Sequence, residues 1–216
     1  MEEHMPGIAL DSVAIFQRKV STFSASYIAD WRDWISTPPH AKPARLGKIL
    51  RKWQACRPNT MRRDELSAGH EPPYLDDLIA QAAPHVEVLS TFDIAQFSPI
   101  GDRAYVLALD ALWNVFEHLS YEGRARAGLA GSVGISKAVM LITDGRVGPA
   151  FDSEVRSALK IGKISNASEW QNALLRVSED IQAFEKEAGL AFSTAKPPGF
   201  EALENGRVYD MALGPR

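Results

Sequence analysis

The sequence predicts a mainly α-helical fold, and three observations support this prediction. Apolar residues recur three or four positions apart through most of the 216 residues, as they do on one face of a helix. The pattern of extended structure is confined to one short piece, at 86–89. Hydrophobic residues make up 45% and charged residues 24% of the chain, which is typical of a globular protein. We therefore expect a single compact helical domain with an N-terminal helical extension.

The first half of the chain is predicted to contain four helices. Asp11 is the expected cap of a long first helix, which Pro38 and Pro39 end. A second helix is expected over 44–56, where apolar residues form one stripe, and a shorter third helix over 74–82. The fourth, over 102–120, is the most apolar helix of the chain.

The second half begins with a segment rich in glycine and then returns to helices. Six of the fifteen glycines lie between 123 and 148, and one short helix is expected among them, over 136–142. Further helices are predicted over 152–159 and 168–189. After the break at 197–199, the tail carries Arg207 and Asp210 among apolar neighbours, which predicts a segment folded back onto the body.

Length and composition exclude several classes of protein. The chain is long enough to bury a core without a disulfide or a structural metal. One cysteine, Cys56, leaves no internal disulfide and no cysteine-rich zinc or iron–sulfur site, and we expect it to be a packed thiol rather than a nucleophile. The five histidines are scattered, so we expect no metal site and no cofactor. The acidic start and the absence of a long apolar run predict a cytoplasmic protein without a membrane span.

The charge is distributed unevenly along the chain. The net charge is −3, yet the stretch 41–63 holds eight basic residues and no acidic one, so the remainder carries −11. This pattern divides the chain into an N-terminal helical region, 1–63, and a helical body, 64–216. A basic helical face favours a polyanionic partner such as DNA, although many such faces are only solvated. The candidate binding residues on the predicted helix are Arg45, Lys48, Arg51 and Lys52.

The window 129–159 is the segment whose spacing suggests chemistry. Gly131-Ser132-Val133-Gly134 is expected to form a hairpin between two helices, and its backbone N–H groups would offer a phosphate site. Ser136 and Lys137 follow at the start of the next helix, with Lys137 as a mobile cation. Asp152 comes fourteen residues after Ala138 and opens the following helix.

This window resembles the helix-hairpin-helix superfamily of DNA glycosylases over about 30 residues. The matching positions are Val133, Gly134, Ala138, Pro149, Asp152, Val155 and Arg156. Gly131 and Ser132 stand where the family has proline and its first hairpin glycine. Ser136 stands where the family's bifunctional members keep a nucleophilic lysine, so the chain is more similar to the branch without it.

The resemblance implies a DNA-binding protein that breaks an N-glycosidic bond. Gly131, Gly134, Ser136 and Lys137 would then hold a backbone phosphate, and the enzyme would turn a base out of the stack. Asp152 would be catalytic, by stabilising the cationic sugar or by activating water.

Two other interpretations stay open. Asp152 is also an ordinary helix cap, and Gly131 and Gly134 also permit a tight turn. The alternative function is a non-catalytic helical scaffold that binds nucleic acid or a protein partner. A third, an enzyme that acts on a phosphate ligand, is less favoured because no second catalytic group is visible in the sequence.

Overall fold

The computed structural model describes residues 9–55, 74–119 and 129–214, and within them the fold is mainly α-helical with no strand. Cys56, the last three of the eight basic residues in 41–63 (Arg57, Arg62 and Arg63) and the glycines at 123 and 128 lie outside these residues. The helices are α1 (Val13–Ser21), α2 (Ala25–Ser36), α3 (Lys42–Lys52), α4 (Tyr74–Val88), α5 (Arg103–Phe116), α6 (Ser132–Ile142), α7 (Ser153–Ala158), α8 (Ala167–Ala188), α9 (Phe192–Ala195) and α10 (Asn205–Leu213).

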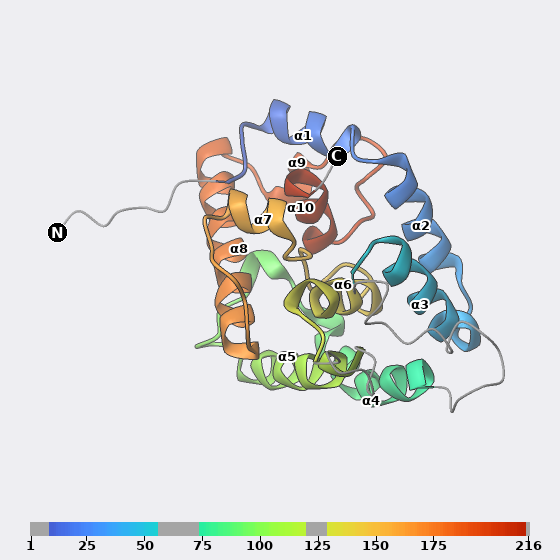
Figure 1. Cartoon of the computed structure of the whole chain (residues 1–216). Coiled ribbons are helices and arrows are strands. Elements are labelled where there is room, and N and C mark those ends of the chain that lie inside the picture. The colour runs from blue at the N-terminus through green and yellow to red at the C-terminus, as the bar shows by residue number, and fades with distance from the viewer. Residues whose placement is uncertain (1–8, 56–73, 120–128, 215–216) are drawn as a thin grey trace.

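The helices surround α6 and α10, which lie in the middle of the molecule. Figure 1 shows α8 along one side, α4 and α5 along the bottom, and α2 and α3 on the opposite side. Nine of the eleven residues of α6 and seven of the nine residues of α10 are buried. Residues of α1, α2 and α3 belong to the same hydrophobic core as those of α6 and α10, so the N-terminal helices are packed against the body.

The predicted long first helix is wrong, because the structure divides it into α1 and α2. The Thr22 hydroxyl donates a hydrogen bond back to the Arg18 carbonyl, and the chain turns before α2 begins at Ala25. Serine and threonine compete with the backbone in this way and favour helix ends. Ser12, not Asp11, precedes α1, and the Asp11 carboxylate instead forms an ion pair with Lys19.

Three other boundaries differ from the prediction, and the first is that of α3, which ends at Lys52 although a helix was expected over 44–56. The third helix continues through Pro84 to Val88, so the piece expected to be extended is helical. The prediction of a glycine hairpin is also wrong, because α6 starts at Ser132 and Gly134 lies in its buried first turn. Packing accounts for the start of α6, whose first turn is buried whatever its local preference, whereas Val88 at the end of α4 is exposed.

The predicted helices at 102–120, 152–159 and 168–189 are confirmed. Asp152 caps α7, and α8 ends at Gly189, whose φ of 67° suits glycine. The tail folds back as α10: the Arg207 N–H donates to the Gly145 carbonyl, and the segment is almost wholly buried. No helix in the described ranges is both long and apolar enough to cross a membrane.

Candidate functional site

Asp152 lies at the start of α7, and hydrogen bonds to two other parts of the chain hold the two residues before it, Ala150 and Phe151. The Ala150 N–H donates to Asp210 Oδ1, and the Phe151 N–H donates to the Ser136 hydroxyl, each at 3.0 Å. Asp152 Oδ1 accepts the N–H groups of Glu154 and Val155, as a helix cap does. Within the described part of the chain its other oxygen, Oδ2, receives no hydrogen bond.

Lys137 approaches the same place from α6. Its side chain is buried, and its Nζ donates a hydrogen bond of 2.9 Å to the backbone carbonyl of Trp53 at the end of α3. The expectation of a mobile surface cation is therefore wrong, because the first turn of α6 lies inside the core and the lysine reaches inward. The contact joins residues 84 positions apart in the sequence.

Aromatic side chains complete the surroundings of Asp152 and Lys137. Both line a small cavity with Tyr27 and Trp53, whose rings lie 5.2 Å apart. The Trp53 indole N–H donates to Asp30 Oδ2, which fixes the ring. The cavity volume is about 10 Å³, which is close to the room that a single water molecule needs.

A buried ion pair forms one wall of this cavity. Arg207 Nη1 donates to Asp210 Oδ2 at 2.6 Å, and both side chains are almost fully buried. The Arg207 guanidinium lies 4.8 Å from the centre of the Trp31 ring, a cation–π distance. We define the Asp152 cluster as Asp152, Lys137, Tyr27, Trp53 and the Arg207–Asp210 pair.

The electrostatics of the Asp152 cluster follow from burial. Desolvation raises the pKa of Asp210 above its ordinary value, and the nearby Arg207 guanidinium opposes this shift. Desolvation also raises the pKa of Tyr27, and the negative charges of Asp152 and Asp210 add to this rise. Desolvation lowers the pKa of Arg207, against the pull of Asp210. The carboxylates and cations therefore influence one another across a small, poorly solvated space.

The glycines and the serine of the expected phosphate site do not lie together in a hairpin. Gly131 is exposed and precedes α6, and a Cβ there would meet nothing within 4 Å, so the position does not require glycine. Gly134 and Ser136 are buried in α6. The Ser136 hydroxyl accepts a hydrogen bond from the Phe151 N–H, so it positions the residue before Asp152 rather than binding a ligand.

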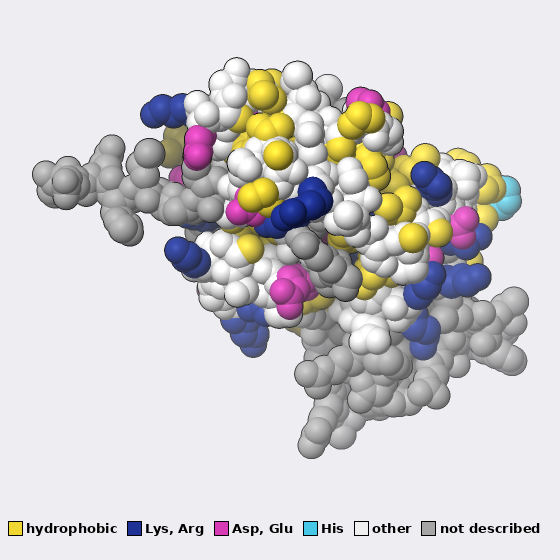
Figure 2. Space-filling view, turned by 90° about the horizontal axis from the view of Figure 1, so that it is seen from above, with side chains coloured by type: hydrophobic (Ala, Val, Ile, Leu, Met, Phe, Trp, Pro, Cys, Tyr) yellow, Lys and Arg dark blue, Asp and Glu magenta, His cyan; other side chains and the backbone are white. Residues whose placement is uncertain are grey.

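The basic residues of α3 lie on the surface, and two of the four candidates form ion pairs with α2. Arg45 contacts Asp33 at 3.0 Å and Lys52 contacts Asp30 at 2.6 Å. Lys48 is exposed and forms no ion pair with a described residue, whereas Arg51 is partly buried. On the face seen in Figure 2, Lys and Arg side chains are spread over several places, with the largest group at one edge. The ion pairs with Asp33 and Asp30 show that neighbouring acidic residues offset much of the positive charge of α3.

The sequence analysis singled out Asp152 and Lys137 but did not place Tyr27, Trp53, Asp210 and Arg207 beside them. One signal was visible: an arginine and an aspartate three residues apart in an apolar tail, which is a spacing that favours a pair on one helix face. Within the described residues no group of histidine, cysteine, aspartate and glutamate is arranged to hold a metal ion.

Comparison with family models, with curated proteins and with solved structures found no match to this chain.

Proposed function

We propose that this protein binds DNA and hydrolyses an N-glycosidic bond, with Asp152 as the carboxylate that stabilises the cationic sugar or activates water. The observation that carries the proposal is that Asp152 lines a cavity with Lys137 and two aromatic rings, while its Oδ2 receives no hydrogen bond from a described residue.

The surroundings suit a carboxylate that meets developing positive charge. Hydrogen bonds to Asp210 and Ser136 fix the two residues before Asp152, so the carboxylate is positioned before a substrate arrives. The cavity has room for one water and not for a base. The sugar would therefore lie over the cavity mouth, with the water beneath it within reach of Asp152.

The chemistry is tested with duplexes that carry damaged bases. Asp152→Asn is the informative variant, because asparagine caps a helix as well as aspartate does while removing the charge. We expect loss of base release with little change in stability. Asp93→Asn is the matched control: Asp93 also caps a short helix, through the Ala95 N–H, and does not line the cavity. Base release that survives Asp152→Asn would overturn the assignment of Asp152.

DNA binding is tested separately, by titration at two salt concentrations with and without an abasic-site analogue. We expect affinity to fall as salt rises and to favour the analogue. Lys48→Gln should reduce the salt dependence by about one phosphate contact, because this lysine is not offset by a described acidic partner. Lys186→Gln, an exposed change on α8, is the control.

The second candidate is the non-catalytic scaffold that binds nucleic acid or a protein partner. The observation in its favour is the ion pairing of Arg45 and Lys52, which leaves a surface less suited to DNA alone. Salt-sensitive DNA binding without base release would support its nucleic-acid form. Absence of binding at low salt would leave the protein-partner form.

A further inference from the structure

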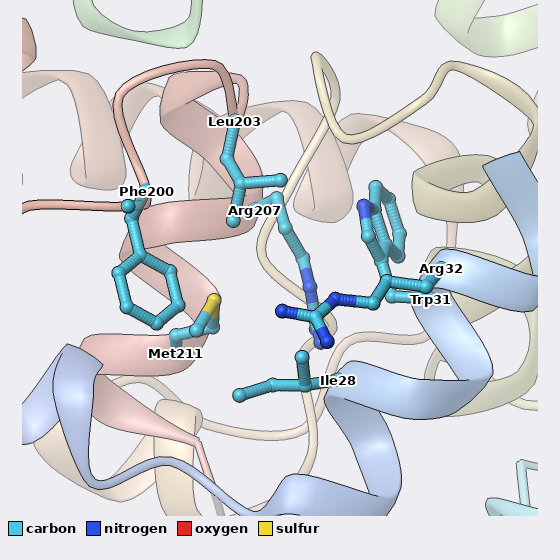
Figure 3. Close-up of a pocket in the computed structure, with 8 residues that line it drawn as sticks. Ile28, Trp31, Arg32, Phe200, Leu203, Arg207 and Met211 are labelled. Atoms are coloured by element: carbon cyan, nitrogen blue, oxygen red, sulfur yellow. The ribbon is translucent and has the colours of Figure 1, made fainter.

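A second and larger cavity lies between α2 and the C-terminal segment that leads into α10. Its volume is about 70 Å³, room for about five water molecules or a small organic molecule. Its walls are apolar and come from Ile28, Trp31, Phe200, Leu203 and Met211. Figure 3 shows the side chains of Arg32 and Arg207 pointing into this space between the apolar walls.

Arg207 lines this cavity and carries two hydrogen-bond donors that have no acceptor in the described part of the chain. The side chain is 1% exposed, and Nη1 is occupied by Asp210. Its Nε and Nη2 are buried and have no acceptor among the described residues. A buried donor without an acceptor is costly, so such groups are expected to have a partner. The two atoms form one edge of the guanidinium, which matches two oxygens of a carboxylate.

Arg32 adds a second positive charge at the cavity. It is exposed on α2, and within the described part of the chain it forms no ion pair. Arg32 and Arg207 together carry +2, and Asp210 contributes −1, so the cavity has a net charge of about +1. One bound monoanion would neutralise it.

We propose that this cavity binds a small organic carboxylate with a short apolar or aromatic body. The carboxylate would lie against Arg207 Nε and Nη2, with Arg32 across from it, and the apolar body would pack against Trp31, Phe200 and Met211. An oxyanion with more oxygens, such as phosphate, would leave some of them facing apolar walls without donors. The site does not include Asp152, but it shares Arg207 with the Asp152 cluster.

Benzoate is the probe, and the full chain is used. We expect benzoate to raise the melting temperature, and the rise should keep growing with the logarithm of benzoate concentration above Kd, because a ligand at concentration L that binds only the folded state stabilises it by RT ln(1 + L/Kd). Benzyl alcohol has the same ring without the charge and should have much less effect. The Nε–H resonance of Arg207, followed by NMR, should shift along a saturation curve that gives the same Kd.

Arg32→Gln separates binding from folding, because Arg32 is exposed and outside the core. The variant should keep the melting temperature of the free protein and weaken benzoate binding about three- to fivefold, the effect of one exposed ion pair. Arg103→Gln is the control, an exposed arginine on α5 that does not line the cavity.

Three outcomes would overturn the proposal. Equal stabilisation by benzyl alcohol would show that the apolar walls bind without the arginines. Equal weakening by Arg32→Gln and Arg103→Gln would show that overall charge, not the cavity, controls binding. Stabilisation by inorganic phosphate, but not by benzoate, would assign the arginines to a phosphate ligand instead.

Discussion

Helices α3 and α10 both carry charged side chains, but their surroundings are opposite. In α3 the charges lie at the surface, and Arg45 and Lys52 contact two carboxylates of α2, of which Asp33 is exposed and Asp30 is buried. In α10 the pair Arg207–Asp210 is almost fully buried, and two arginine nitrogens lack a partner among the described residues. The basic helix is the most conspicuous charged segment of the sequence, yet the tail holds the groups whose pKa values are shifted by burial, Arg207 and Asp210. Charge density along a chain therefore does not indicate where charge is energetically important.

The largest expected effect comes from breaking the buried pair. Asp210→Ala leaves the Arg207 guanidinium buried without its acceptor, so the free energy of unfolding should fall by about 3–5 kcal/mol in urea denaturation. The double variant Arg207→Met with Asp210→Leu should recover most of this loss, because it removes both charges. A loss below about 1 kcal/mol for Asp210→Ala would contradict the described burial.

The next effect tests how closely α10 is packed. A Cβ on Gly206 would lie 2.6 Å from the Gly145 carbonyl oxygen and 2.7 Å from that of Arg146. Gly206→Ala should therefore displace α10 and reduce the free energy of unfolding by about 1–3 kcal/mol. Gly162→Ala is the control, since a Cβ there meets nothing within 4 Å. Thermal melts of the two variants would contradict this packing if they were alike.

A third prediction extends the comparison to another buried carboxylate. Asp180 accepts the N–H groups of Ala9 and Leu10 and the Tyr209 hydroxyl, and burial raises its pKa. A raised pKa in the folded state means that stability is lost as pH rises from about 3.9, the unfolded value, through the folded pKa. Asp180→Asn should therefore gain stability relative to the natural protein over this interval. Urea denaturation from pH 3.5 to pH 7 measures the difference; a constant difference would contradict the prediction.

The capping role of Asp152 gives a smaller effect. Asp152→Ala removes the acceptor for the Glu154 and Val155 N–H groups and should lower the free energy of unfolding by about 1 kcal/mol. Asp152→Asn should change it by only a few tenths of a kcal/mol. The difference between the two, measured by thermal melts, separates the cap from the charge on which the proposed chemistry depends.

The smallest effect is expected in α3. Lys52→Ala removes the ion pair with Asp30, but the Lys52 side chain is 54% exposed, so the loss should be at most about 1 kcal/mol. Asp30 keeps its bond from the Trp53 indole, which limits the cost further. A loss as large as that of Asp210→Ala would remove the distinction between the two regions.

The sequence by itself determined the helical fold class, the cap at Asp152 and the end of α8 at Gly189. Each depends on residues within about four positions, so periodicity and capping preferences were sufficient. The break at Thr22 is also local, but apolar spacing continues across it and concealed it.

Tertiary structure decided which charged and polar residues surround Asp152. Lys137 reaches the Trp53 carbonyl across 84 residues, and Asp210 holds Ala150 across 60. No local pattern specifies such contacts, because they depend on how α6 and α10 pack in the core. The same packing placed Arg207, with two nitrogens that have no acceptor among the described residues, beside an apolar cavity, whereas the basic residues that stood out in the sequence remained at the surface.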